Sequence, residues 1–259
     1  MSYLGRLGRG RILVLWLIAI LSGSFYFLDW SRLFMDWPAL VDSYVRSSKF
    51  AVSVLATVLL LFGWQWKKNA EDAWKLLLAF IAINLGDLAF VAKVAGFSNA
   101  ILSSIGIGVF LIAQLLLIRR GIANLRSIDF TQRSKKHFAV VTAILMLGLA
   151  LAMILVLWKI NLERAAQVPI GLVAVYALIV GSSTWVGLQT CIGTYYSPIV
   201  SRLICAGMVM FFCCDCTVGL GQVLTGCTPG IVISSLTWMF YAPALVMLAL
   251  SITEHQLDV

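Results

Sequence analysis

Two aspartates, Asp87 and Asp215, lie within stretches that are long and apolar enough to cross a membrane. The chain has eleven carboxylate side chains, and the other nine fall in or beside predicted loops, where water solvates them. A carboxylate in a bilayer core is costly unless it is paired, protonated or facing a water-filled cavity. These two residues are therefore the first candidates for a functional site.

Two carboxyl groups in one poorly solvated cavity resist simultaneous ionisation, so one stays neutral while the other is an anion. The neutral acid can protonate a substrate atom while the anion activates water, which suits hydrolysis. Asn84 lies three residues before Asp87 and shares its helix face. Gly86 lets a neighbouring helix approach closely. The alternative is that two protonated acids only hold helices together.

The two histidines, His137 and His255, fall outside the predicted membrane spans. A membrane zinc hydrolase with histidine ligands, a haem held by two histidines and a Ser-His-Asp triad would each lack a required residue. We therefore expect the chemistry to depend on carboxyl groups, with no metal and no cofactor.

The composition predicts an all-α integral membrane protein. Of its 259 residues, 61% are hydrophobic and 12% charged, with a mean hydropathy of +0.99, whereas soluble domains are about a quarter charged. A transmembrane helix needs about 20 largely apolar residues. A bundle of eight such helices, forming one membrane domain over residues 1–259, is predicted at about 12–28, 50–66, 76–92, 100–118, 138–158, 168–188, 203–224 and 231–252.

Basic residues are distributed unevenly over the predicted loops, with thirteen on the side of the N-terminus and six on the other. The positive-inside rule places both termini in the cytoplasm, in a bacterial inner membrane or an endomembrane. Topology thus explains the net charge of +8 without a nucleic-acid partner. Residues 29–49 have apolar side chains at helical spacing and are predicted to form an amphipathic segment in the membrane interface.

An internal repeat is also predicted. An offset of 128 residues places Asp87 on Asp215, and both acid-bearing spans run from inside to outside. Each acid is then roughly 18–20 Å from the cytoplasmic end of its helix. Spans 3–4 and 7–8 are therefore interpreted as parallel repeats about an axis along the membrane normal, an arrangement known in transporters, with the two acids at one depth.

The order of these features resembles the YhhN family, the lysoplasmalogenases, over residues 45–252. That family has a Gly-Asp pair in its third span, which matches Gly86-Asp87 here. Its Ser-Asp pair in the seventh span appears as Cys214-Asp215. Both acids therefore match the family pattern in type and in order.

Other positions depart from the family pattern. The Lys-Pro of its second span appears as Lys49 followed by phenylalanine. A histidine of its fourth span is replaced by Gln114, and the tyrosine after it by Leu117. The Tyr-x-x-Gln of its eighth span keeps Tyr241 but has Ala244 in place of the glutamine.

Animal members of the family hydrolyse the vinyl ether bond of lysoplasmalogens. The resemblance therefore implies a hydrolase acting on a membrane lipid or lysophospholipid, with Asp87 and Asp215 as its catalytic pair. The sequence leaves open whether the chain forms a homo-oligomer. The substrate site is expected to be shaped by Asn84, Gln114 and Tyr241. Lys49 is expected to bind a phosphate of the substrate at the membrane interface.

Two other functions stay open. The replaced histidine and glutamine favour a non-catalytic lipid-binding relative, which would bind lipid and release no product. Buried acids and parallel repeats are equally natural in a proton-coupled transporter.

Overall fold

The computed structural model describes residues 8–31, 34–35, 39–67, 70–94, 99–163, 170–223 and 230–252. The regular elements of these residues are all helical, with one short 3-10 helix, η1 (Trp64–Trp66), between the second and third long helices. The long helices are α2 (Arg9–Ser31), α3 (Ala39–Phe62), α4 (Ala70–Val94), α5 (Asn99–Arg126), α6 (Arg133–Glu163), α7 (Ile170–Gln189), α8 (Pro198–Val223) and α9 (Gly230–Leu250).

All eight long helices of the described chain are long and apolar enough to span a membrane, which confirms the predicted fold class. Many large apolar side chains lie on the outside of the bundle, such as Leu13, Trp16 and Ile20 on α2. An outward apolar surface is what lipid requires of a membrane helix, since lipid cannot solvate polar groups.

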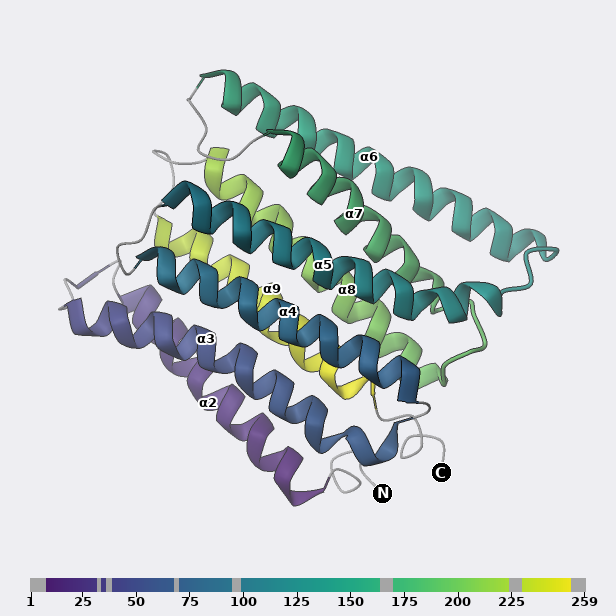
Figure 1. Cartoon of the computed structure of the whole chain (residues 1–259), viewed down its shortest axis with the longest axis horizontal. Helices are drawn as coiled ribbons and strands as arrows, with labels where there is room; N and C mark the ends of the chain where they lie inside the picture. The colour runs from purple at the N-terminus through teal and green to yellow at the C-terminus, as the bar shows by residue number, and fades with distance from the viewer. Residues whose placement is uncertain are drawn as a thin grey trace.

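The helices run side by side, from α2 and α3 at one edge of the bundle to α6 at the other (Figure 1). Helix α9 is central, because it packs against α2, α3 and α8, while α5 packs against α4 and α7. We call the end at which α2 begins and α9 ends the near end, and the opposite end the far end. Helices α4 and α8 begin at the near end, whereas α3, α5, α7 and α9 begin at the far end.

Small residues allow α9 to pack closely in the centre of the bundle. Ala244 and Ala249 are fully buried, and a methyl group at Gly207 of α8 would lie 3.3 Å from the Ala244 carbonyl oxygen. Pro243 lies inside α9 without ending it. Close helix contacts through small residues are common in membrane proteins, because lipid gives helices no hydrophobic driving force to associate and close packing takes its place. Prolines within membrane helices are tolerated because neighbouring groups satisfy the freed backbone.

The segment predicted to lie in the interface, residues 29–49, is only partly described. Residues 29–31 end α2 and residues 39–49 begin α3, so this described part extends two spanning helices. Its place relative to a membrane surface, like the cytoplasmic position of the termini, stays a prediction.

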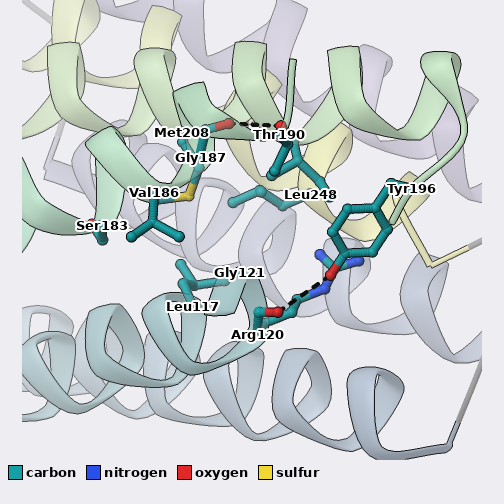
Figure 2. Close-up of a pocket in the computed structure, with 11 residues that line it drawn as sticks. Leu117, Arg120, Gly121, Ser183, Val186, Gly187, Thr190, Tyr196, Met208 and Leu248 are labelled. Atoms are coloured by element: carbon teal, nitrogen blue, oxygen red, sulfur yellow. Dashed lines mark hydrogen bonds between the residues drawn. The ribbon is translucent and has the colours of Figure 1, made fainter. Parts of the chain in front are cut away.

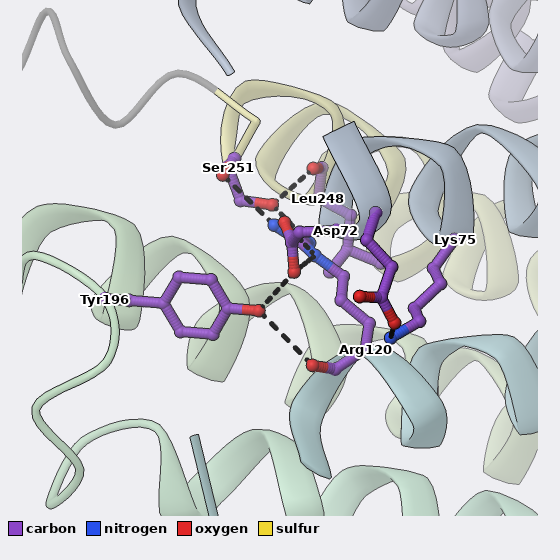
Figure 3. A network of polar contacts seen from close by, with 7 residues as sticks. Asp72, Lys75, Arg120, Tyr196, Leu248 and Ser251 are labelled. Carbon is purple, nitrogen blue, oxygen red and sulfur yellow. Dashed lines mark hydrogen bonds and ion pairs between the residues drawn. The ribbon is translucent and has the colours of Figure 1, made fainter. Parts of the chain in front are cut away.

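A buried ion pair ties several segments together at the near end (Figure 3). Arg120 of α5 donates from Nε to both carboxylate oxygens of Asp72 of α4, at 3.2 and 3.0 Å. Its Nη1 donates to the Ser251 hydroxyl just after α9, at 2.7 Å, and the Tyr196 hydroxyl donates to Asp72 at 2.6 Å. The prediction that the carboxylates other than Asp87 and Asp215 are solvated in or beside loops is wrong for Asp72, which is 8% exposed.

Asp72→Asn is expected to destabilise the protein by about 3–5 kcal/mol, because it removes the carboxylate that pairs with the buried Arg120 charge. Thermal unfolding in detergent measures the change. The control is Glu71→Gln on the preceding residue, whose exposed carboxylate pairs with Lys75 on the same helix. Equal unfolding temperatures for the two variants would contradict a structural role for the buried pair.

Candidate functional site

Asp87 and Asp215 occupy equivalent positions along their helices. Each is the eighteenth residue of a helix that begins at the near end, Asp87 in α4 and Asp215 in α8. The two carboxyl groups therefore lie at similar depths in the bundle, in the half that is closer to the far end. The predicted structural repeat itself stays a prediction.

Asp87 accepts hydrogen bonds from two neighbouring helices. The Tyr241 hydroxyl of α9 donates to its Oδ2 at 2.8 Å, and the Ser53 hydroxyl of α3 donates to the same oxygen. The structure thus brings Tyr241, a residue singled out in the sequence, to this acid. Ser53 was not singled out, although it lies one helical turn after Lys49, because a serine in a membrane helix is usually a packing residue.

Asp215 has one donor among the described residues. The Tyr176 hydroxyl of α7 donates to its Oδ1 at 3.0 Å, while its Oδ2 is buried and has no hydrogen-bond partner there. Tyr176 was missed in the sequence, because an isolated tyrosine in an apolar span carries no sign of which helix it will face.

The two acids lie in one region of the bundle. The ring centre of Tyr241, whose hydroxyl donates to Asp87, lies 5.6 Å from that of Phe211, and Phe211 precedes Asp215 by four residues on α8. The helix turn that carries Asp215 is therefore next to the tyrosine that donates to Asp87.

Packed aromatic rings fix the position of the Tyr241 hydroxyl. The centre of the Tyr241 ring lies 5.0 Å from the ring centre of Trp238, 5.6 Å from that of Phe211 and 6.4 Å from that of Phe110. Phe110 can approach because residue 86 is a glycine. A methyl group at this position would lie only 2.6 Å from the Phe110 ring. The glycine next to Asp87 therefore allows α5 to support the tyrosine that donates to this acid.

Asn84 lies one turn from Asp87 towards the near end and has its own partners. Its Nδ2 donates to the Thr57 hydroxyl at 2.6 Å and to the Phe80 carbonyl oxygen at 2.8 Å. Its Oδ1 is buried without a partner among the described residues. Asn84 shares the polar interface of α3 and α4, but none of its hydrogen bonds joins it to either acid.

Gln114 is fully buried in α5, away from the direct partners of the acids. The Ser183 hydroxyl of α7 donates to its Oε1 at 2.5 Å, and its Nε2 has no partner among the described residues. It therefore links α5 to α7, and no hydrogen bond connects it to Asp87 or Asp215.

A cavity of about 10 Å³ lies between the Gln114 contact and the near end. Figure 2 shows Leu117 and Gly121 of α5 facing Val186 of α7 across it. The space suits roughly one water molecule. No direct hydrogen-bond partner of either acid lines it, so this cavity is separate from the acid site.

Lys49 is buried at the far end beside an acid that was predicted to be solvated. Its Nζ lies 2.6 Å from Oδ2 of Asp29, which is 2% exposed, and donates to the Ser234 hydroxyl at 2.9 Å. The Lys49 ammonium also lies 5.4 Å from the centre of the Phe25 ring. Lys49 thus joins α3 to α2 and α9, about one turn from Ser53 towards the far end.

Comparison with known proteins identifies one family. A sequence model of the YhhN family matches residues 48–252, which contain both acids and their three hydroxyl donors. No curated protein and no solved structure matches the chain. The family suggested by the sequence features is therefore confirmed over most of the chain.

Gly86→Ala is expected to lower stability by about 1–3 kcal/mol, because the added methyl group would displace the packed Phe110 ring. Gly108→Ala on α5 is the matched control, since a methyl group there meets nothing within 4 Å. The control should be neutral or slightly stabilising, as alanine favours helix. Thermal unfolding in detergent compares them, and a Gly86→Ala protein as stable as the control would disprove the close contact.

Proposed function

The chain belongs to the YhhN family, and we propose that it hydrolyses the vinyl ether bond of a lysophospholipid at Asp87 and Asp215. The observation that carries the proposal is the pair of acids at similar depth, each accepting a hydrogen bond from a hydroxyl group of another helix. Such groups in a membrane bundle are costly, which makes a functional role the default explanation.

The chemistry requires a proton donor and a proton acceptor and no other reagent than water. A neutral carboxylic acid protonates the alkene carbon of the vinyl ether, which leaves an oxocarbenium ion. The neighbouring carboxylate stabilises this cation and accepts a proton from the water that attacks it. The resulting hemiacetal breaks down to an aldehyde and an alcohol.

The position of Lys49 favours a substrate that carries a phosphate group. It lies about one turn from Ser53, which donates to Asp87, so a phosphate near its ammonium would leave the glycerol portion of a lysophospholipid close to the acids. Binding there would exchange part of the Lys49–Asp29 pairing for contact with the phosphate. Asn84 and Tyr241 are proposed to border the lipid chain, and Gln114 to stabilise the wall behind it.

A second candidate is a lipid-binding protein without catalysis. Gln114 replaces the histidine of the family pattern and is bonded to Ser183. An amide does not exchange a proton at pH 7 as a histidine can, so the chain lacks one group that could assist proton transfer. Such a protein would co-purify with lipid and release no aldehyde.

Asp87→Asn and Asp215→Asn are each expected to lower aldehyde release from a lysoplasmalogen by about 10²–10⁴-fold, because each removes a group that donates or accepts a proton. Mass spectrometry of the products from purified protein gives the rate. The control is Asp129→Asn, an exposed acid whose pKa is lowered by hydrogen bonds from the Thr131 hydroxyl and backbone N–H. Full activity in both central variants would contradict the proposal.

Lys49→Gln is expected to raise KM by about tenfold or more with little change in kcat, because it removes a charged contact that substrate and transition state share. Lys75→Gln is the control, since Lys75 also pairs with an acid, Glu71, but at the near end. A fall in kcat with KM unchanged would contradict a headgroup role for Lys49.

A further inference from the structure

We infer that the two acids have separate, fixed roles: Asp215 enters the reaction as the neutral acid that protonates substrate, and Asp87 as the anion that activates water. The chemical half of this assignment rests on the proposed function. The protonation states rest on the hydrogen bonds of the two carboxyl groups and can be measured without any substrate.

Asp87 is equipped to hold a negative charge. Two hydroxyl groups, from Ser53 of α3 and Tyr241 of α9, donate to its Oδ2. Both donors are buried, and the aromatic rings around Tyr241 hold its hydroxyl in place. Donors directed at a carboxylate stabilise its ionised form, because they replace the water that the charge loses on burial.

Asp215 is poorly equipped to hold a charge. Its single donor among the described residues, Tyr176, is directed at Oδ1, and its Oδ2 is buried without a partner there. A negative charge on that oxygen would be desolvated and uncompensated, which is the costliest state for a carboxyl group. A proton on Oδ2 removes the charge and has no acceptor among the described residues, so it is available to a substrate.

The reverse assignment uses the same donors less well. An ionised Asp215 would have one hydroxyl donor, while two donors would point at a neutral Asp87. A negative charge is therefore favoured at Asp87, where more donors converge, over Asp215.

The cycle is balanced with respect to atoms and protons. Asp215 transfers its Oδ2 proton to the alkene carbon, and the π electrons of the alkene form the new C–H bond. Water adds to the oxocarbenium carbon while Asp87 takes one of its protons. In hemiacetal breakdown, Asp87 returns that proton to the leaving ether oxygen, and the hemiacetal hydroxyl proton passes to Asp215. Both acids then have their starting protonation states.

Tyr176 is a positioning residue in this cycle. Its hydrogen bond to Oδ1 leaves Oδ2 as the oxygen that carries the proton and fixes the plane of the carboxyl group. Tyr176→Phe should therefore lower kcat by about tenfold with KM unchanged, since proton transfer depends on orientation. Tyr44→Phe is the control, because that hydroxyl is bonded to Ser24 at an exposed edge of the bundle.

The protonation states can be tested with dicyclohexylcarbodiimide, an apolar reagent that enters membrane proteins. The carboxyl O–H adds across a C=N bond of the reagent, and rearrangement gives a stable acylurea, so only a protonated acid reacts. Purified full-length protein is treated at pH 7 without substrate, and the modified peptides are identified by mass spectrometry. The expected result is about tenfold or more adduct at Asp215 than at Asp87.

Matched variants separate protonation from reagent access. Asp87→Asn should keep the adduct at position 215, and Asp215→Asn should lose it. In infrared spectra, the carbonyl band of a neutral carboxylic acid should disappear only in Asp215→Asn. Modification of Asp87 instead, equal modification of both acids or no modification of either would overturn the inference. Selective modification of Asp215 without aldehyde release would support the protonation states and reject the proposed function.

Discussion

A carboxyl group inside a membrane bundle must obtain its hydrogen bonds from the protein, because lipid offers none. This constraint determines the central architecture of the chain. Asp87 obtains donors from Ser53 and Tyr241, which requires α3, α4 and α9 to meet at one level. Asp215 obtains a donor from Tyr176, which requires α7 to pack against α8 at that level. The packing of these helices is therefore tied to the hydrogen bonds that the two acids require.

The same rule applies at both ends of the bundle, with ion pairs in place of hydroxyl groups. Lys49 and Asp29 join α3 to α2 at the far end, and Arg120 and Asp72 join α5 to α4 at the near end. Buried pairs of this kind add little net stability but are costly to break, so they favour one arrangement of the helices. The Oδ2 atom of Asp215, which is buried without a hydrogen-bond partner among the described residues, lies between these two fixed ends.

The eight helices could be predicted from the sequence, because a run of about 20 apolar residues has few alternatives to a membrane span. The sequence also identified the family, while the roles of Asp87 and Asp215 stay a proposal. It failed for Asp29 and Asp72, which are buried in ion pairs. A carboxylate near the end of a span looks the same in the sequence whether water or another helix surrounds it. The sequence also failed for Tyr176, because helical periodicity gives the face of a residue and leaves its partner helix undetermined.

We propose that a carboxylic acid of the bundle protonates the alkene carbon of a vinyl ether. Reaction of purified protein with a lysoplasmalogen in D₂O, followed by immediate reduction of the aldehyde to trap it, tests this step directly by mass spectrometry. We predict one deuterium atom on the carbon next to the former aldehyde carbon. Product without deuterium at that carbon, or no aldehyde at all, would contradict the account.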